Sequence, residues 1–331
     1  MKTIRWGIIA TGNIASKFAL ALNYEASRSN SVRLAAVASR DAAKSARFAE
    51  QWGCARSYGS YAELFADPEV DAVYIATPNN LHVELSIAAL KSGKAVLCEK
   101  PVSLDASSLL PVIETARQEK RFYMEAMWMK CNLSFQKAMS WIQEGKIGAP
   151  RYLRADFFLD SPFNPESRLY NPVLGGGALL DLGIYPVTCA HAAAGKIKPD
   201  AVSSIIKNAP TGVDSYNSSH LVWKSGFTAD LSSSINLQGI KESRSAFIIG
   251  ESGSIVLPYF WMAEEAILMG SDGAVLEHVK KPFECNGYEY EIREASLCIE
   301  SGATESPVQT WADSIMVMEI LDQIRTVAAY E

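Results

Sequence analysis

The sequence predicts a two-domain α/β protein, and three observations carry that prediction. Short apolar strands alternate with helical stretches over the first 125 residues, which is typical of a parallel sheet with helices on both faces. A glycine-containing turn, Ala10-Thr11-Gly12, joins the first strand to the first helix. After about residue 150 the strands follow one another as hairpins, which predicts a largely antiparallel sheet. We therefore expect a doubly wound Rossmann domain at residues 1–125 and a second α/β domain with an open sheet at residues 126–331.

The first region alternates strand and helix in a regular order. The expected strands are 4–10, 32–38, 71–76, 95–98 and 122–126. The expected helices are 14–22, 42–52, 81–92 and 107–120. In such a sheet the loops at the carboxyl ends of the strands line the ligand crevice, so the residues after each strand are the first candidates for a site.

The second region opens with an expected strand at 152–158, a polar loop and a helix at 178–194. Three hairpins follow, with strands at 221–223 and 227–235, at 246–249 and 254–257, and at 265–269 and 274–279. Pro307 opens a last expected helix, which carries an apolar stripe from Trp311 to Leu321. Few helices remain to cover a second face of the sheet, so we expect a homodimer formed through it.

Composition limits the possible functions. The chain has 331 residues, of which 48% are hydrophobic and 21% charged, and its net charge is −6. Without a lysine and arginine stripe, this charge argues against a nucleic-acid partner. The first strand begins near residue 4 without a secretion signal, and no apolar run approaches about 18 residues, so we expect a cytoplasmic protein and no membrane contact. The six scattered cysteines are expected to be reduced, and the four histidines lack the spacing of metal ligands.

The turn after the first strand is a candidate dinucleotide site. Glycine lets the backbone approach a pyrophosphate, and the helix that follows offers amide groups and the positive end of its dipole. The candidate contacts are Ala10, Thr11, Gly12, Asn13 and Ile14. Ala10 stands where such motifs usually have their first glycine, so a tight turn without a ligand is the alternative. The position of the turn at the start of a strand–helix series favours cofactor binding.

The end of the second strand indicates which cofactor. It reads Ser39-Arg40, with Lys44 one helical turn later, and a hydroxyl with two cations suits the 2′-phosphate of NADP. Asp41 could instead serve the ribose of NAD, and the cations could be solvated residues at a helix start. We expect NADP(H), with NAD as the alternative. The loops after the third and fourth strands add the candidate contacts Thr77, Pro78, Asn80, His82, Glu99 and Lys100, with a structural role for His82 as the alternative.

Three residues suggest the chemistry. Lys100 follows the fourth strand, while Asp181 and Tyr185 lie four residues apart on an otherwise apolar helix preceded by three glycines. Oxidation of a carbinol needs a hydride acceptor, which a nicotinamide provides, and a proton acceptor, which a tyrosine can be if an ammonium stabilises its phenolate. We expect Tyr185 to be the acid/base, Lys100 to supply the charge, and Asp181 to orient the substrate hydroxyl or the lysine. The alternatives are a surface lysine and a core tyrosine.

These motifs resemble those of the Gfo/Idh/MocA oxidoreductases over nearly the whole chain. The resemblance is carried by WGIIATGNIA at 6–15, ATPNNLH at 76–82, CEKP at 98–101, MEAMW at 124–128 and GGGALLDLGIYPV at 175–187. The stretch 165–172 and the tyrosine at 185 are similar to a branch of dihydrodiol and D-xylose dehydrogenases. The resemblance implies a Rossmann domain, a second domain whose open sheet often forms a dimer interface, and Lys100, Asp181 and Tyr185 as catalytic residues.

The resemblance also implies a sugar-like or cyclic diol substrate. The candidate pocket residues are Trp128, Phe158, Arg168, Tyr170 and Trp261, each of which could equally belong to the core. Lys130-Cys131-Asn132 stands where relatives often have arginine followed by an aromatic residue, so the particular substrate stays open. Two other functions remain as alternatives: a non-catalytic NADP-binding regulator, which the fold permits, and an NAD-dependent glycosidase, for which the helix around Asp181 has few histidines.

Overall fold

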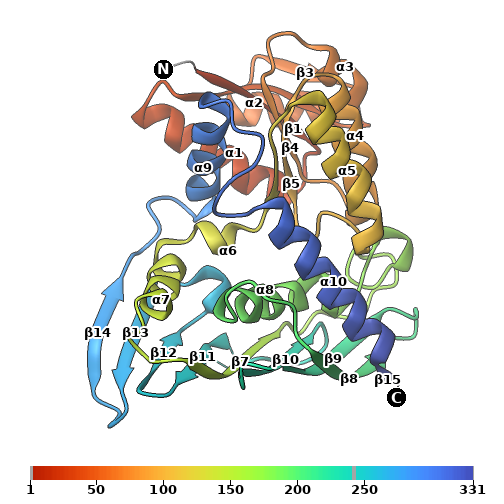
Figure 1. Ribbon diagram of the computed structural model, residues 1–331. Coiled ribbons are helices and arrows are strands. Elements are labelled where there is room, and N and C mark those ends of the chain that lie inside the picture. The colour runs from red at the N-terminus through yellow and green to blue at the C-terminus, as the bar shows by residue number, and fades with distance from the viewer. Residues whose placement is uncertain (1–2, 241–243, 331) are drawn as a thin grey trace. The chain divides into compact units, whose positions relative to one another are not determined.

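The computed structural model describes residues 3–240 and 244–330, and these form two compact units (Figure 1). The first unit contains the residues up to Ser103, then Ser107–Trp128 and Phe283–Ser314. The second contains Leu104–Ala106, Met129–Pro282 and the residues from Ile315 onward. The expected division near residue 125 therefore leaves out one segment of the first unit, because the chain returns to that unit at Phe283–Ser314.

A parallel sheet forms the centre of the first unit. Its strands are β1 (Ile4–Ile9), β2 (Val32–Ala38), β3 (Arg56–Tyr58), β4 (Ala72–Ile75), β5 (Ala95–Glu99) and β6 (Tyr123–Ala126). Their order, β3-β2-β1-β4-β5-β6, is that of a Rossmann fold, as the sequence predicts. β1 pairs in parallel with both β2 and β4, and β4 is fully buried, which explains why these strands are almost continuously apolar.

Helices cover both faces of this sheet. They are α1 (Asn13–Arg28), α2 (Ala42–Trp52), α3 (Tyr61–Ala66), a 3-10 turn at Asn79–Leu81, α4 (His82–Lys91), α5 (Ala106–Glu119) and α9 (Tyr288–Glu300). The short α6 (Trp128–Cys131) begins in this unit at Trp128 and continues in the second. Figure 1 shows α1 and α9 on one side of β1, β4 and β5, with α4 and α5 on the other. The doubly wound arrangement places every strand-to-helix loop that the sequence analysis singled out at the carboxyl edge of the sheet.

An aromatic core ties α9 to the amino-terminal strand of the unit. Phe18 of α1 stacks on Tyr74 of β4 with ring centroids 3.7 Å apart, and Trp6 of β1 packs edge-on against Phe18 at 5.7 Å. The indole Nε1 of Trp6 donates a hydrogen bond to Ser296 Oγ of α9 at 3.2 Å. Trp6, Phe18 and Tyr74 have no exposed surface, and burying a side chain of this size stabilises the fold by about 1.5–3 kcal/mol.

The second unit is built on one mixed sheet. Its strands are β7 (Pro150–Phe158), β8 (Ala201–Asn208), β9 (Asp214–Val222), β10 (Thr228–Ser234), β11 (Ala246–Gly250), β12 (Gly253–Leu257), β13 (Glu265–Gly270), β14 (Val275–Lys280) and β15 (Ala329–Tyr330). Among the described residues their order is β14-β13-β12-β11-β7-β10-β9-β8-β15. Only the β7–β10 and β8–β15 pairs of this described sheet are parallel, so the expectation of a largely antiparallel sheet is confirmed.

The helices of the second unit lie on one side of this sheet. They are α7 (Leu133–Gln143), 3-10 turns at Pro172–Leu174 and Phe260–Met262, a π-helical turn at Leu179–Gly183, α8 (Ile184–Ala193) and the later part of α10 (Trp311–Val327). α7 contacts β12 and β13, and α8 contacts β7 and β10. Figure 1 shows none of these described helices on the opposite face. The stretch Pro172–Ala193 has the length and mean hydropathy (1.4) of a membrane span, but 83% of it is buried inside the structure, as in the core helix of a globular protein.

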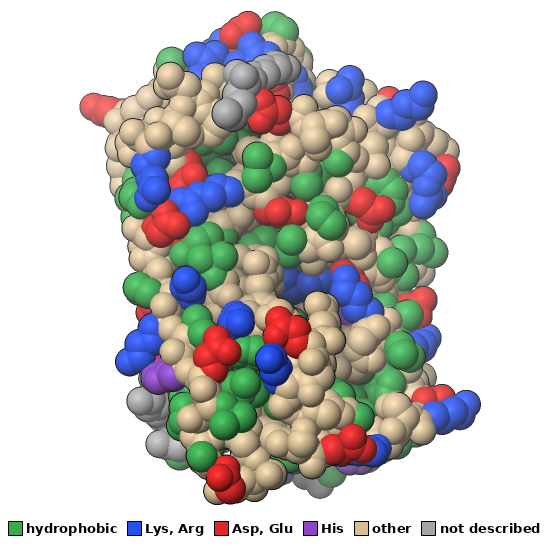
Figure 2. Space-filling view, turned by 60° about the vertical axis from the view of Figure 1, so that its left-hand side comes forward, with side chains coloured by type: hydrophobic (Ala, Val, Ile, Leu, Met, Phe, Trp, Pro, Cys, Tyr) green, Lys and Arg blue, Asp and Glu red, His purple; other side chains and the backbone are tan. Residues whose placement is uncertain are grey.

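Figure 2 shows lysine and arginine side chains lying among aspartate and glutamate side chains on the visible face. Charged side chains of both signs are thus mixed on this face.

The junction of α1 and α9 offers a test of the first unit. Arg293 of α9 donates to both carboxyl oxygens of the buried Glu25 of α1, at 2.7 and 2.6 Å, and also to Glu284. The exposed Arg28 pairs with Glu284 and the Tyr24 hydroxyl. We expect Arg293→Met to lower the free energy of unfolding by about 2–3 kcal/mol, because it leaves a buried carboxylate without its cation. Arg28→Met should cost less than about 1 kcal/mol. Urea unfolding followed by tryptophan fluorescence measures both, and equal losses would contradict the assignment.

Candidate active site

The turn between β1 and α1 has the backbone of an anion site. Ala10 adopts a φ of 87°, in the left-handed region that an alanine enters at a cost of about 1–2 kcal/mol. Gly12 is the N-cap of α1, no side chain bonds the helix amides there, and the first turn contains no acidic residue. The amides at this helix start therefore point toward Thr11 and Gly12 without a competing carboxylate. This geometry fits a pyrophosphate, and Ala10 retains the glycine-like conformation that the motif requires.

The segment after β2 has a donor set that fits a phosphate. Asp41 caps α2 by accepting from the backbone N–H of Lys44 at 3.1 Å, and its other oxygen lies 3.9 Å from Lys44 Nζ. The Asp41 carboxylate is thus committed to its own helix rather than placed to receive a ribose. Ser39 Oγ accepts from the Asp41 N–H at 3.3 Å. The cations of Arg40 and Lys44 and the hydroxyl of Ser39 therefore lie at this strand end, and this set of donors fits a 2′-phosphate.

Tyr61 is a residue of this segment that the sequence analysis missed. Burial raises the pKa of the Tyr61 hydroxyl, while the charge of Arg40 and a hydrogen bond from its side chain act in the opposite direction. The Arg40 guanidinium is therefore held against the first residue of α3. In the sequence, the signal for Tyr61 is its position directly after Ser60, the N-cap of α3.

His82 is assigned to the structure of the unit rather than to ligand contact. Its side chain has no exposed surface, with Nδ1 2.7 Å from the Pro101 carbonyl oxygen and Nε2 2.9 Å from that of Thr77. Burial lowers the pKa of His82, so the neutral ring donates to one of the two carbonyls. His82 links the loop after β4 to the cis peptide between Lys100 and Pro101. The expectation that it contacts a cofactor is corrected in favour of the structural alternative.

Glu99 holds the turn that carries Lys100. Its carboxylate accepts a short hydrogen bond from the Tyr74 hydroxyl, and its second oxygen accepts from the Lys100 backbone N–H at 3.2 Å. Burial raises the pKa of Tyr74 well above its usual value, so the hydroxyl stays protonated and remains a donor. Lys100 is partly exposed directly after β5. The Glu99 side chain thus fixes the backbone from which the Lys100 side chain extends.

Glu291 of α9 is a second buried acid close to this turn. It has no exposed surface, and neither of its carboxyl oxygens has a hydrogen-bond partner among the described residues. Burial, and then the charge of Glu99, raises the pKa of Glu291 well above its usual value, which favours its neutral form. The sequence does hold a signal: Glu291 lies three residues from Tyr288 and four from Ala295, on the buried stripe of α9.

In the second unit, Asp181 and Tyr185 lie on one buried helix. Asp181 is 4% exposed within the π-helical turn Leu179–Gly183, and Tyr185 is 6% exposed in the first turn of α8. π-helical turns are rare overall, but those that occur often lie at functional sites. All residues from Leu179 to His191 are buried, so a carboxylate and a phenol stand out against an apolar helix.

Arg168 pairs with the Asp181 carboxylate. Its Nη1 donates to Asp181 Oδ1 at 2.8 Å, and its own side chain is 57% exposed. The loop that carries Arg168 packs on Gly176, where a Cβ atom would lie 3.0 Å or less from the carbonyl oxygens of Arg168, Leu169 and Asn171. Glycine is therefore needed at position 176 for a steric reason, because it lets this loop approach the helix and bring a cation to Asp181. The sequence named both residues without predicting that they form a pair.

Phe157, rather than the expected Phe158, is the aromatic residue beside Tyr185. The Phe157 ring lies 5.7 Å from that of Tyr185 and stacks on Trp261 at 3.7 Å. Side chains alternate along β7, with Leu153, Ala155 and Phe157 toward the helices, so Phe158 points to the opposite face of the sheet. The expectation for Phe158 is therefore corrected, and strand alternation was the signal that could have made the choice.

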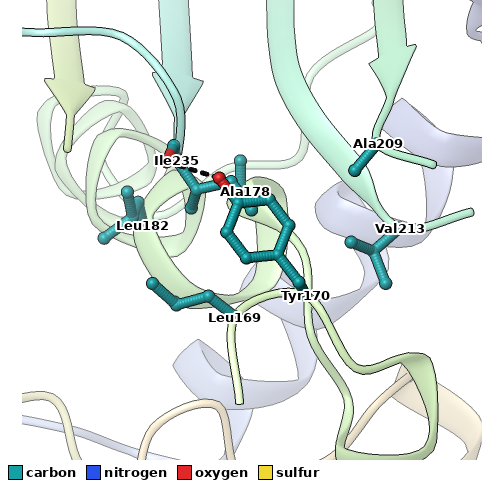
Figure 3. Packing of buried hydrophobic residues seen from close by; sticks show 7 residues of the cluster. All are labelled: Leu169, Tyr170, Ala178, Leu182, Ala209, Val213 and Ile235. Atoms are coloured by element: carbon teal, nitrogen blue, oxygen red, sulfur yellow. Dashed lines mark hydrogen bonds between the residues drawn. The ribbon is translucent and has the colours of Figure 1, made fainter. Parts of the chain in front are cut away.

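Tyr170 belongs to the core. It is 2% exposed, and its hydroxyl lies 2.9 and 3.0 Å from the carbonyl oxygens of Ser161 and Ile235, to which it donates. Figure 3 shows its ring among buried apolar side chains from the helix and the neighbouring strands, with the bond to Ile235 drawn. The ring has no surface for a substrate, so this expectation too is corrected.

Trp261, another aromatic candidate, is buried, whereas Trp128 is partly exposed in the first unit. Trp128 stacks on Tyr288 with ring centroids 5.3 Å apart and lies 6.0 Å from Phe283. Gly287, with a φ of 95°, permits this contact, because a Cβ atom there would lie 2.7 Å from the indole ring. No group of three or more metal-ligating side chains gathers among the described residues.

The first unit is a Rossmann fold with a turn suited to an anion and a strand end suited to a phosphate. The second unit presents a phenol and a paired carboxylate. Together these features are those of a dinucleotide-dependent oxidoreductase. Residues 4–127 match the family model described as oxidoreductase family, NAD-binding Rossmann fold, and residues 135–256 match the Gfo/Idh/MocA C-terminal domain. The chain belongs to the Gfo/Idh/MocA family of oxidoreductases.

Its relatives are named dehydrogenases and reductases. Trans-1,2-dihydrobenzene-1,2-diol dehydrogenase of Mus musculus is 32% identical over 97% of this chain and 96% of its own length, and that of Homo sapiens is similar to the same extent. A 3-ketoreductase from Actinomadura kijaniata, solved with NADP and TDP-benzene, has a TM-score of 0.86 at 26% identity and covers 99% of both chains. Levoglucosan dehydrogenase, solved with NADH and levoglucosan, shares the fold with a TM-score of 0.85 at 22% identity, covering 98% of this chain and 97% of its own.

Proposed function

We propose that this enzyme is an NADP(H)-dependent dehydrogenase or reductase that acts on a CH–OH or carbonyl carbon of a sugar-like or cyclic diol substrate. The observation that carries the proposal is the buried helix with Tyr185 and an Asp181 carboxylate held by Arg168 at 2.8 Å. The names of relatives matched over nearly their full length support the substrate class, since they include a dihydrobenzene-diol dehydrogenase and a 3-ketoreductase.

We assign the proton chemistry to Tyr185. Its phenol would take the proton from a substrate hydroxyl in oxidation and return it in reduction. Bound NADP would supply the nicotinamide that accepts or gives the hydride. Asp181, kept in place by Arg168, would accept a hydrogen bond from a substrate hydroxyl and so orient the sugar or diol. Lys100, on the turn braced by Glu99, would supply the positive charge that favours the tyrosinate.

The preference for NADP(H) rests on the end of β2. Ser39, Arg40 and Lys44 form the donor set for a 2′-phosphate, and Asp41 is engaged as the cap of α2. The complex of the Actinomadura ketoreductase with NADP supports the same cofactor here. Tyr61 would brace Arg40 from the side of α3.

Replacement of Arg40 tests this preference. We expect Arg40→Ala to weaken NADPH binding by about 1–3 kcal/mol, because a charge-assisted contact is lost, and to change NADH binding little. Arg47→Ala, on the helix α2 that follows Arg40 but away from the strand end, is the matched control. Both affinities are measured by quenching of tryptophan fluorescence. Equal NADPH and NADH affinities in the native protein would contradict the proposal.

A pair of tyrosine variants tests the acid/base. We expect Tyr185→Phe to lower kcat at least 100-fold, in the range of about 10²–10⁴ for loss of a general acid or base, with NADPH affinity unchanged. Tyr170→Phe removes the same atom from a core tyrosine and should lower the melting temperature but not kcat. The assay follows NADP reduction at 340 nm with D-xylose, D-glucose, levoglucosan and trans-cyclohexane-1,2-diol. Native hydride transfer by Tyr185→Phe would show that the proton leaves by another route.

We further propose that the enzyme is a homodimer formed through the uncovered face of the second-unit sheet. Side chains of β7, β11, β12 and β13 line a hollow of about 480 Å3 on it, among them Phe247, Ile249 and Met269. Ile249 is 46% exposed, and an apolar sheet face of this kind is ordinarily covered. A second copy is the commonest cover for such a surface.

Light scattering at micromolar concentration should give twice the mass of one chain. Ile249→Lys should shift the protein to a monomer, because it places a charge in the centre of the apolar half of the face. Ile197→Lys, at an exposed position outside the sheet, should leave the mass unchanged. A monomer mass for the native protein would reject the dimer.

A further inference from the structure

The start of the helix that carries Asp181 and Tyr185 is capped from a distant strand. Asp214, the first residue of β9, accepts a hydrogen bond from the Leu179 backbone N–H through Oδ2 at 2.6 Å. Leu179 is the first residue of the π-helical turn that contains Asp181. The amides of a helix start need acceptors, and no side chain of the helix itself supplies one here. A carboxylate from 35 residues later in the chain takes this place.

The backbone at the cap is shaped to admit this carboxylate. Gly177 has a φ of 122°, and a Cβ atom at this position would lie only 2.2 Å from Asp214 Oδ1. Only glycine satisfies both requirements, the left-handed backbone and the space for the carboxylate. Gly177, the last glycine of the run, thus leaves space for the Asp214 carboxylate, whereas Gly176 leaves space for the loop of Arg168.

The same network reaches the other end of the π-helical turn. Asn217 of β9 donates through Nδ2 to Ser233 Oγ at 2.5 Å and lies 3.5 Å from Asp214 Oδ2. Ser233 Oγ would in turn be 2.9 Å from a Cβ atom at Gly183, the last residue of the turn. Strands β9 and β10 therefore hold the turn at Leu179 and at Gly183, with Asp181 between these two points.

We propose that Asp214 is a positioning residue, whose carboxylate fixes the first turn of this helix and thereby sets where Asp181 and Tyr185 stand. The catalytic part of this inference rests on the function proposed above, while the cap itself does not. A shift of about 1 Å in a catalytic group can cost roughly 100-fold in rate, so a cap that fixes the helix start has a kinetic consequence.

The charge on Asp214 gives the positioning a pH dependence. Burial raises the pKa of Asp214 to about 6, opposed by the hydrogen bonds from Leu179 and Asn217 and by the charge of Arg325 in α10. Its register partner on β8 is the uncharged Asn208, Ser233 of β10 is bonded to the neighbouring Asn217, and the helix that it caps carries Asp181, paired with Arg168. As the pH falls through about 6, the carboxylate gains a proton and loses the charge that favours the amide end of a helix.

Three variants and one control test the inference. Asp214→Ala removes the cap, Asp214→Asn keeps its shape without the charge, and Gly177→Ala pushes the carboxylate away from the other side. Ser215→Ala removes a neighbouring side-chain hydrogen bond on the same strand, which runs to the Lys207 carbonyl, and serves as the control. The readouts are kcat with NADP and trans-cyclohexane-1,2-diol, and amide hydrogen exchange of the peptide that covers residues 178–185.

We expect Asp214→Ala to lower kcat by about 10- to 100-fold with the affinity for NADPH unchanged, and to speed exchange at residues 179–183. The kcat ratio of Asp214→Asn to the native enzyme should be near one at pH 5, where the native residue is protonated, and should fall as the pH rises through about 6. Because both enzymes keep Tyr185, the effect of its titration on kcat cancels in this ratio. If Asp214→Ala does not fold, Gly177→Ala should reproduce the loss of kcat and the faster exchange.

Native kcat and native exchange in Asp214→Ala would overturn the inference, and so would a ratio for Asp214→Asn that does not vary with pH. An equal loss in Ser215→Ala would show that any disturbance of β9 has the same effect, which would also overturn it. If no substrate in the panel reacts even in the native enzyme, the proposed function fails, while hydrogen exchange still decides whether Asp214 holds the helix.

Discussion

Asp181 is a carboxylate in an otherwise apolar helix, and the cost of taking its charge out of water governs how the second unit is built. A buried carboxylate is tolerated only where donors or a cation compensate for lost hydration. Arg168 supplies the cation from a loop, and Gly176 gives that loop room to reach the helix. The loop of Arg168 thus follows a path that brings a cation to the buried carboxylate.

The first unit meets the same requirement in two other ways. Glu25 is compensated by the two-pronged guanidinium of Arg293, whereas Glu99 receives a hydroxyl and a backbone amide. Burial beside Glu99 raises the pKa of Glu291 well above its usual value, which favours its neutral form. Acids with different partners therefore lie close together around the turn of Lys100. The field at that lysine depends on which of them carries a proton.

Much of the fold could be predicted from sequence, because strand ends and apolar periodicity are local signals. The loops after β1, β2, β4 and β5 were found for that reason, as were Asp181 and Tyr185. Local signals did not reveal that Tyr170 is a core residue, since a tyrosine near a glycine run reads the same whether its hydroxyl meets a carbonyl or a substrate. The Asp214 cap was missed because its partner lies 35 residues away. Phe157 could have been chosen over Phe158 from strand alternation alone.

The return of Phe283–Ser314 to the first unit has a consequence for how the protein is made. Trp6 and its partner Ser296 are separated by 290 residues, so almost the entire chain must leave the ribosome before β1 and α1 acquire their cover. Until then the emerging Rossmann strands present Phe18, Tyr74 and an uncompensated Glu25 to solvent or to a chaperone. The second unit, by contrast, lies mostly between these two events. Its last segment, from Ile315 onward, nevertheless follows the return of Phe283–Ser314, so neither unit is complete until at least residue 314 has been made.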